Sequence, residues 1–412
     1  MTDGAMSLIQ FARANALFLS AGVLLSFGSS FGQTYFISIF AGEIRAEFGL
    51  SHGAWGGIYT AGTTASALLM IWAGGLTDRF RVRQLGAITT VMLAVSCLAM
   101  AAIPGPIALI GVIFALRFFG QGMMSHLSVV AMARWFVATR GRALSISSMG
   151  FAVGQALLPL IFVAMLAVFH WRMLWVIGAV VLLVSLPLLS RLLRAERTPQ
   201  SIAESTASLG MGGRHWTRGQ VWRHWLFWLA LPLMLGPPSW GTALFFQQVH
   251  LTEVKGWGLV DYVALLPFYT IAGVSATFLS GALIDRYGTG RLMQLFLIPF
   301  AAGFYVMSQC ETLWGALLGL VLIGVGTGGQ ATVPNAFWAE FYGTRHLGSI
   351  KALAAAIMIF GSAIGPGISG VLIDQGFDFA EQSVGIAIYM LVAALVVSIG
   401  IQKARGQLPA TA

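Results

Sequence analysis

Gly-Gly-Leu-Thr-Asp-Arg-Phe, residues 74–80, decides the fold because a close copy, Gly-Ala-Leu-Ile-Asp-Arg-Tyr, occupies residues 281–287. Each copy ends a long apolar run. The same ungapped shift of 207 residues, from Gly74 to Gly281, pairs further identical residues: Gly122 with Gly329, Gly141 with Gly348, Gly154 with Gly361, Ala156 with Ala363 and Pro159 with Pro366. The chain therefore consists of two related halves, and duplicated apolar segments are typical of membrane transporters.

The composition indicates a membrane protein, since 58% of the 412 residues are hydrophobic and only 9% are charged. A helix needs roughly 20 residues to cross an apolar layer of about 30 Å. Twelve such runs are predicted, at residues 15–40, 53–76, 84–103, 106–133, 143–168, 172–193, 222–249, 260–284, 291–309, 312–338, 348–373 and 381–402. We therefore predict an all-α integral membrane protein, with twelve transmembrane helices in two pseudo-symmetric six-helix bundles.

The two bundles are expected at residues 1–193 and 222–412, joined by a cytoplasmic linker at 194–221. The linker is rich in Arg, Ser, Thr, Gly and Gln and has few large apolar residues before Trp216. Such a composition is typical of a partly ordered tether.

The orientation follows from the basic residues, which are retained on the cytoplasmic side of membrane helices. With the N-terminus inside, only Arg45, Arg172 and Lys255 fall on the outer face. We predict that both termini are cytoplasmic, in a multi-pass protein of the cell inner membrane. The net charge of +9 arises from the helix ends of the inner face, so we do not expect a nucleic acid partner.

Catalytic and cofactor motifs are absent from the sequence. The two cysteines, Cys97 and Cys310, suit neither a metal site nor a disulfide framework. No nucleophile set or phosphate-binding loop is found, so we expect neither an enzyme nor an ATP-driven pump, and no metal or other cofactor.

The repeated loop carries a family resemblance. A Gly, three residues, Asp-Arg and then a basic cluster follow the second predicted helix and again the eighth, which resembles the signature loop of the major facilitator superfamily. Arg117 with Gly120 and Gly122 is similar to the second motif of that superfamily. Where its antiporter motif has Gly-Pro, this chain has Gly154-Gln155, which weakens an assignment to export.

Two short segments resemble the monocarboxylate and oxalate-formate branch of the superfamily. They are Phe48-Gly49-Leu50-Ser51 leading to Trp55, and Arg117-Phe118-Phe119-Gly120. The resemblance implies a monocarboxylate-like substrate. It also implies an Arg within the eighth helix, where this chain has none before Arg286.

The signature loops are predicted to form a cytoplasmic gate, whose ion pairs would break when the inner face opens. The alternative is a static anchor and turn. Glu340 is expected to pair with Arg286 or Arg345. The predicted gating residues are Asp78, Arg79, Arg83, Arg134, Asp285, Arg286, Arg291, Glu340 and Arg345.

Arg117 is the basic residue nearest the middle of a predicted span. An unpaired Arg there costs at least about 2.5–3.5 kcal/mol on insertion scales, so it must face a partner or a wet cavity. Three roles stay open: binding an anionic substrate, packing and proton coupling against polar groups of the first helix, or a purely structural bond to carbonyl groups.

The superfamily architecture places the first, fourth, seventh and tenth helices around the central pathway. Their polar residues, with those of the fifth and eighth, suggest a neutral, amphipathic pocket with one fixed positive charge, although any single member can instead bond helix to helix. The predicted substrate-binding residues are Arg117, Gln33, Tyr35, Gln121, Gln155, Trp240, Gln247, Tyr269, Gln330 and Asn335.

This pocket favours a small organic anion over a cation, because no Asp or Glu lies deep in a predicted span. We predict a secondary transporter that takes up a monocarboxylate-like anion with H⁺ by alternating access, as a functional monomer in the lipid bilayer. The proton would travel with the substrate or use His126 or Asp261. Two alternatives are export of a metabolite or drug, and a non-transporting membrane receptor or scaffold.

Overall fold

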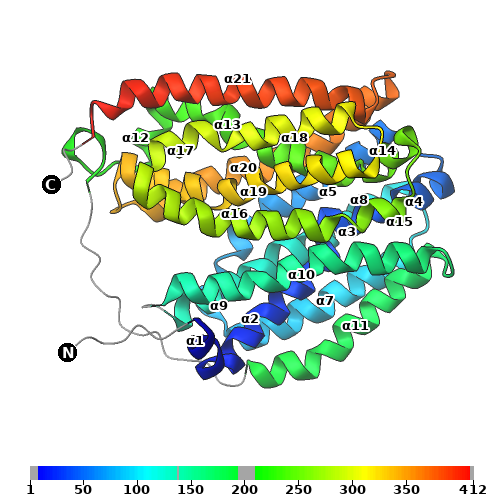
Figure 1. Ribbon diagram of the computed structural model, residues 1–412. Helices are drawn as coiled ribbons and strands as arrows, with labels where there is room; N and C mark the ends of the chain where they lie inside the picture. The colour runs from blue at the N-terminus through cyan, green and yellow to red at the C-terminus, as the bar shows by residue number, and fades with distance from the viewer. Residues whose placement is uncertain (1–7, 137–138, 194–208, 409–412) are drawn as a thin grey trace. The chain divides into compact units, whose positions relative to one another are not determined.

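The computed structural model describes residues 8–136, 139–193 and 209–408, and its helices form two compact units (Figure 1). Unit 1 comprises Met1–Phe48 and Ala61–Glu204, and unit 2 comprises Gly49–Thr60 and Ser205–Ala412. Throughout these described ranges, every regular element is a helix.

The predicted spans are found in the structure. Ten of the described helices are long and apolar enough to cross a membrane, and a pair bent by 48°, Ala16–Gly32 and Thr34–Phe48, makes an eleventh span. The helix α5, His52–Ala73, has 22 residues and takes the place of the twelfth. The prediction of twelve transmembrane helices in two bundles is therefore confirmed.

Unit 1 is built around three helix pairs. The helix α2 packs on α10, and α7 packs on α11. The helix α5 approaches α8 so closely at Gly62 that a Cβ atom there would lie 2.9 Å from the Ile110 carbonyl oxygen. Its elements are α1 (Leu8–Ala14), α2 (Ala16–Gly28), η1 (Ser29–Gly32), α3 (Thr34–Ile37), η2 (Ser38–Phe40), α4 (Ala41–Phe48), most of α5, α6 (Leu76–Arg79), α7 (Val82–Ala101), α8 (Pro106–Leu116), η3 (Arg117–Met124), α9 (Ser125–Trp135), α10 (Arg140–Leu166) and α11 (Trp171–Leu192).

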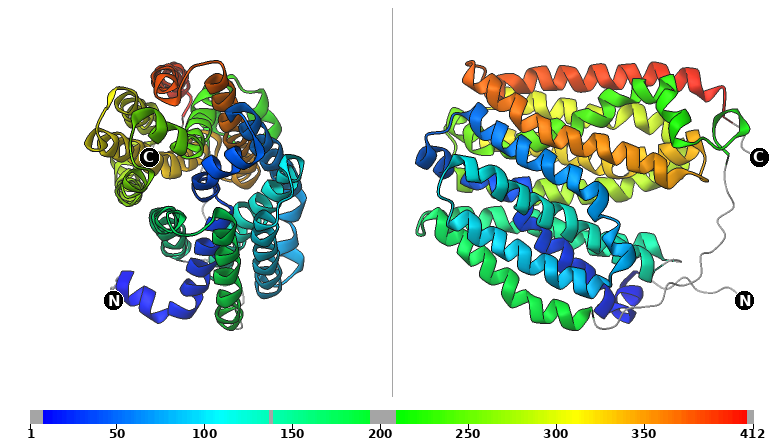
Figure 2. Two further views of the ribbon diagram at one scale, coloured as in Figure 1. Left: turned by 90° about the vertical axis from the view of Figure 1, so that its right-hand side faces the viewer. Right: turned by 180° about the vertical axis from the view of Figure 1, so that it is seen from behind.

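Unit 2 repeats these pairs, with α13 on α20, α18 on α21 and α16 on α19 (Figure 2). Its elements are η4 (Met211–Gly213), α12 (Arg218–Arg223), α13 (Trp225–Phe246), α14 (Gln248–Lys255), α15 (Leu259–Val263), α16 (Leu266–Tyr287), α17 (Thr289–Leu295), α18 (Leu297–Gln309), α19 (Leu313–Tyr342), α20 (Leu347–Asp374) and α21 (Phe379–Arg405). At Gly324 a Cβ atom would lie 2.5 Å from the Tyr269 carbonyl oxygen. Small residues thus allow close helix packing where lipid gives no hydrophobic drive.

Two basic residues that we predicted on the outer face hold chain connections together. The Arg172 guanidinium donates to the Glu47 carboxylate at 2.6 Å and to the carbonyl oxygens of Ala101 and Ile103. The Lys255 ammonium donates to the Ser308 carbonyl oxygen at 3.0 Å. Each unit therefore uses one basic side chain to bond backbone carbonyl oxygens at the end of its third helix.

The predicted linker is described in part. Its first part, residues 194–208, lies outside the described residues, whereas residues 209–221 fold against unit 2. Trp216 is buried, and its backbone N–H donates to the Tyr342 carbonyl oxygen at the end of α19. The Gly212 N–H donates to the Gln407 carbonyl oxygen beyond α21. We call residues 209–217 the strap.

The strap is expected to loosen at low pH through His224. This ring packs 4.6 Å from Trp216 and lies 3.2 Å from the Tyr342 hydroxyl. Burial lowers the pKa of His224, and the positive charge of Arg214 lowers it further. The docked strap thus prefers the neutral ring, so its stability is complete above the unfolded pKa of about 6.5 and falls as pH drops below that value.

Hydrogen exchange of the strap amides measures this effect. Exchange should accelerate, beyond the intrinsic pH trend, as the pH falls from about 6.5 to about 5.5, and His224→Phe should remove the excess. An unchanged pH profile in His224→Phe would assign the loosening to another group.

Candidate functional site

The first membrane helix is interrupted in its middle. The helix α2 runs into the 3₁₀ turn η1, after which Gln33 adopts an extended conformation with φ −87° and ψ 152°, and α3 follows. Backbone that leaves the helix at membrane depth is tolerated only where protein covers it or a cavity adjoins it. All residues from Gly28 to Ile39 are buried, so here protein covers the break.

Arg117 lies at this break. Its side chain is 1% exposed, and Nη1 donates a 3.0 Å hydrogen bond to the Gly32 carbonyl oxygen, the last of η1. A charge-assisted bond is stronger than a neutral one. The structure thus holds the guanidinium against the first helix, the geometry that the packing and structural alternatives require.

The fourth helix is irregular at the same level. Arg117–Met124 form a π-helical segment, η3, between α8 and α9. A Cβ atom at Gly120 would lie 2.5 Å from the Gly32 Cα atom, so glycine allows η3 to touch η1 directly. Short π segments within α-helices are frequent at functional sites. Two backbone irregularities and one buried cation therefore meet at the centre of unit 1.

The other predicted residues of unit 1 are buried or half-buried. Tyr35 is buried and donates from its hydroxyl to Ser30 Oγ at 2.8 Å. Gln33 and Gln155 are buried as well, and Gln121 is half-buried. Among these predicted residues, Tyr35 thus makes a buried polar pair with Ser30 within the first membrane helix.

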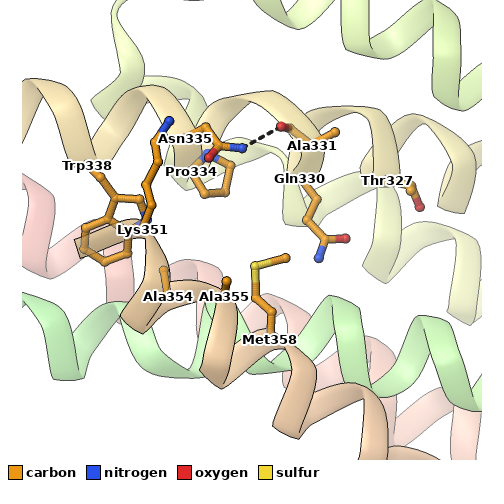
Figure 3. A pocket seen from close by; sticks show the side chains of 10 residues that line it. All are labelled: Thr327, Gln330, Ala331, Pro334, Asn335, Trp338, Lys351, Ala354, Ala355 and Met358. Atoms are coloured by element: carbon orange, nitrogen blue, oxygen red, sulfur yellow. Dashed lines mark hydrogen bonds between the residues drawn. The ribbon is translucent and has the colours of Figure 1, made fainter. Parts of the chain in front are cut away.

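Unit 2 contains an open cavity of about 340 Å³ between α19 and α20. Figure 3 shows Lys351 between the Trp338 ring and Asn335, and Gln330 directed from α19 toward Met358. The lining residues are Thr327, Gln330, Ala331, Pro334, Asn335, Trp338, Lys351, Ala354, Ala355 and Met358. Two predicted residues, Gln330 and Asn335, are thus brought together in one pocket.

The remaining predicted residues of unit 2 are not in this lining. Tyr269 reaches the cavity indirectly, because its hydroxyl shares a 3.0 Å hydrogen bond with Thr327 Oγ1. Trp240 packs edge-on against Tyr389, at 6.3 Å between ring centroids, and Gln247 is buried at the end of α13.

The first signature loop is held by the fourth helix. Arg134 Nη1 donates to the Thr77 carbonyl oxygen at 2.5 Å, and His126 Nε2 lies 3.2 Å from the Gly74 carbonyl oxygen. The side chains of Asp78 and Arg79 lie outside the described residues, so their predicted pairing stays a prediction. Arg83 is exposed.

The second loop differs from our prediction for Glu340. Instead of pairing with Arg286 or Arg345, its carboxylate accepts hydrogen bonds from the backbone N–H and hydroxyl of Thr289, the first residue of α17. A carboxylate is favoured at a helix N-terminus, which explains this choice. Arg286 lies over the Tyr287 ring at 5.4 Å, and Arg286, Arg291 and Arg345 are exposed. The side chain of Asp285 lies outside the described residues.

Arg134→Ala should slow the transport cycle more than it weakens ligand binding, because it frees the Thr77 loop without touching either polar centre. We expect the rate to fall by about threefold to tenfold, on the scale of one charge-assisted bond. Transport rate and ligand affinity measured in parallel check this. A matched control is Arg191→Ala in the exposed last turn of α11. Equal transport rates in Arg134→Ala and Arg191→Ala would indicate that the first signature loop is a static anchor and not a gate.

The segment after the first helix has a structural role. Gly49 has a positive φ of 62°, which ends α4 and favours glycine. Ser51 Oγ accepts from the Ala54 N–H and caps α5, and it donates to the carboxylate of Asp374 at 2.6 Å. Trp55 stacks on Phe246 at 5.6 Å. The first turns of α5 are therefore fixed within unit 2.

Comparison with known protein families identifies the family of the chain. The family described as Major Facilitator Superfamily matches residues 22–366, and matches again over residues 268–405. The chain belongs to the major facilitator superfamily. This membership agrees with the resemblance of the signature loops, and the monocarboxylate branch is a finer assignment that it does not test.

Relatives of this facilitator are distant. A protein of Thermoproteus tenax named "Uncharacterized 38 kDa protein in 23S RNA operon" is 28% identical over 313 residues, covering 75% of this chain and 74% of that protein. The bovine "Solute carrier family 2, facilitated glucose transporter member 8" is 28% identical over 35% of this chain and 30% of its own.

A solved structure shares the fold of this facilitator over its whole length. It is a bacterial homolog of the human lysosomal transporter Spinster in an inward-facing, unoccupied conformation, with a TM-score of 0.73. It is 15% identical, and the match covers 99% of this chain and 100% of that one.

Sequence reasoning missed Lys351 as a pocket residue of this facilitator. It was grouped with the basic residues of the inner face, because it lies only four residues after the start of α20 at Leu347. The repeat does distinguish Lys351, because the equivalent residue of the first half, 207 positions earlier, is the apolar Leu144.

Proposed function

We propose that this facilitator is a secondary transporter of a small organic anion, which it takes up together with H⁺ by alternating access. It would act as a monomer in the cell inner membrane, with both termini in the cytoplasm. Membership of the major facilitator superfamily supports the transport part of the proposal, and the buried charge of Arg117 supports the choice of an anion.

The observation that carries the proposal is the sign of the buried charge. Among the described residues, Arg117 is the most deeply buried charged residue, at 1% exposed, and no Asp or Glu is buried. Ionisable groups inside a membrane protein mark substrate and ion pathways, because burying them is costly. A positive interior repels cations and favours the entry of anions.

Alternating access needs helices that can change their packing. The break at Gln33 and the π segment η3 meet through Gly32 and Gly120, where backbones touch without side chains between them. Irregular helices at membrane depth are the usual location of substrate sites in secondary transporters. We therefore propose that the contact between η1 and η3 changes during alternating access.

A neutral solute is the competing substrate, because part of the chain is similar to a protein named as a glucose transporter. Counterflow separates the two. Purified protein in liposomes preloaded with one unlabelled solute should exchange labelled lactate, acetate or butyrate, and should not exchange labelled glucose, after subtraction of protein-free liposomes. Exchange of glucose alone would overturn the anion proposal. Ligand binding without exchange of any solute would favour a receptor or scaffold.

A further inference from the structure

We propose that Gln330 selects the substrate by a hydroxyl group, and that the cavity between α19 and α20 takes a 2-hydroxy monocarboxylate in preference to the same acid without the hydroxyl. This inference rests on the proposed function and narrows its substrate class. It concerns unit 2 alone, to which both helices belong.

Gln330 presents an unengaged carboxamide to the cavity. The side chain is half-buried and is directed from α19 toward Met358 (Figure 3). Among the described residues, none makes a hydrogen bond to this carboxamide, whereas Lys351, in the same lining, has a contact of its own. One amide oxygen and one NH₂ group of Gln330 are therefore available to a ligand.

The other neutral polar groups of the lining are wholly or partly engaged. Thr327 Oγ1 donates its hydrogen to the Ile323 carbonyl oxygen at 2.9 Å, so the Tyr269 hydroxyl is the donor in the 3.0 Å bond between the two hydroxyls. Asn335 Nδ2 donates to the Ala331 carbonyl oxygen at 2.9 Å and leaves its own Oδ1 as an acceptor (Figure 3). The two carboxamides of the lining thus keep two acceptor oxygens and one NH₂ group.

These acceptors favour a ligand that carries a hydrogen-bond donor. Pro334 adds to them, because it lies inside α19 and lacks the N–H that would normally bond to the backbone carbonyl oxygen of Gln330, four residues earlier. A carboxylate only accepts hydrogen bonds, so a plain acid can use the NH₂ group of Gln330 and none of the oxygens. A hydroxyl supplies the missing donor, and an acid with a hydroxyl therefore matches the lining better than an acid without one.

The shape of a carboxamide indicates where that hydroxyl lies. Its oxygen and its NH₂ group are side by side on one planar carbon. In a 2-hydroxy acid, a carboxylate oxygen and the hydroxyl lie on adjacent carbons, so Gln330 can donate to the first and accept from the second at once. A hydroxyl farther along the ligand cannot share the same carboxamide with the carboxylate.

The rest of the cavity limits the ligand to a short body. Trp338 and Met358 line it, and a recess of about 20 Å³ continues from it to Leu233, Met234 and Phe296. The main cavity of about 340 Å³ is at the small end of ligand pockets, which run from about 300 to 1,000 Å³. An acid of a few carbons with an alkyl end fits this combination.

The duplication shows that the fold does not need an amide at this position. The residue equivalent to Gln330 in unit 1, 207 positions earlier, is Met123, and Leu127 is equivalent to Pro334. Methionine has nearly the length of glutamine and no amide, and Met123 is buried. The carboxamide of Gln330 therefore calls for a purpose other than helix packing.

Binding to the purified, detergent-solubilised protein tests the inference. The probes are labelled lactate, propionate and 3-hydroxypropionate, which differ only in the hydroxyl, and equilibrium dialysis gives the affinities. Wild type should bind lactate about threefold to tenfold more tightly than either of the others, the effect of one additional hydrogen bond. In Gln330→Met the ratio of lactate to propionate affinity should fall to about one. This ratio does not depend on the fraction of protein that is folded.

Two further variants separate the hydroxyl from other effects. Gln330→Glu replaces the NH₂ group by an oxygen and adds a negative charge, so it should bind all three acids about tenfold or more weakly. Gln402→Met makes the matched change at an exposed residue of α21, outside the cavity lining, and should keep the wild-type ratio. Melting temperatures check that each variant folds.

The outcomes for the two proposals differ. A wild-type protein that binds the acids without preferring lactate, or a lactate preference that survives in Gln330→Met, would overturn the role of Gln330 and leave anion transport standing. Equal binding of lactate and 3-hydroxypropionate would overturn the 2-hydroxy assignment. No binding of any of the three acids by wild type would overturn both proposals.

Discussion

Arg117→Ala should abolish most transport while the protein still folds and inserts. The change removes the bond from Nη1 to the Gly32 carbonyl oxygen and leaves the break of the first helix without its cation. Replacing a buried Arg by Ala removes an insertion cost of about 2.5–3.5 kcal/mol, so expression should not suffer. We expect the transport rate to fall by at least about tenfold, the effect of losing about 1.4 kcal/mol in the rate-limiting step.

The measurement compares initial uptake rates at equal protein content, with Arg191→Ala in the last turn of α11 as an Arg→Ala change at an exposed site. Arg117→Lys retains the charge without the planar, multidentate guanidinium, and should recover part of the rate. Normal transport by both Arg117→Ala and Arg117→Gln would remove the buried cation from the mechanism.

Gly56→Leu should also stop transport, by preventing close packing within unit 2. A Cβ atom at Gly56 would lie 2.7 Å from the Pro366 carbonyl oxygen of α20 and 3.1 Å from the Gly367 Cα atom. Backbone atoms cannot move aside as a flexible side chain can. Forcing a leucine into a packed contact costs about 1–3 kcal/mol or more, so α5 and α20 should separate there.

This contact matters to the proposed cycle because α5 is shared between the units. Its residues up to Thr60 cluster with unit 2, and the remainder cluster with unit 1. A displacement of the first turns of α5 from α20 would therefore also disturb the remainder of the same helix in unit 1. We expect Gly56→Leu to lower the transport rate by about tenfold or more, with ligand affinity changed much less.

The adjacent glycine is the matched control. A Cβ atom at Gly57 would meet nothing within 4 Å, so Gly57→Leu makes the same substitution, one position along the helix, into open space. It should transport at close to the wild-type rate. Similar losses in the two variants would show that helix propensity, and not the contact with α20, is responsible.

The fold was predictable because its signals are long and repeated. Apolar runs of helix length mark the spans, and the copy of residues 74–80 at 281–287 defines the halves. The same helix pairs then recur in both units, with α2 on α10 and α13 on α20, as expected of a duplication. Backbone polar groups inside a membrane must bond to one another, and a helix satisfies this within one segment, so an apolar composition is enough to predict the helices.

The irregular backbone at Gln33 and in η3 was not predictable from the same signals. Residues 15–40 read as one continuous apolar helix, and nothing in hydropathy distinguishes an α turn from a π turn. The break depends on contacts between segments distant in sequence, chiefly the bond from Arg117 to Gly32 and the close approach of Gly120. Tertiary contacts therefore decided the local conformation.

The candidate site was predictable in part for a similar reason. Gln330 and Asn335 stand out as polar residues in an apolar helix, and the structure places both in one cavity. Lys351 did not stand out, because a basic residue near the inner end of a helix has a sufficient explanation in topology. Its direction toward Asn335 and Trp338 is a matter of packing, and only the structure supplies it.

Proton-driven accumulation in liposomes tests the central claim most directly. Purified protein is reconstituted, an inward proton gradient is imposed, and labelled lactate is followed against protein-free liposomes, Arg117→Ala liposomes and labelled glucose. The account predicts that lactate accumulates above its equilibrium level in wild type only, and that a protonophore collapses the accumulation. Uptake of glucose without lactate, or lactate levels equal to those of protein-free liposomes, would contradict it.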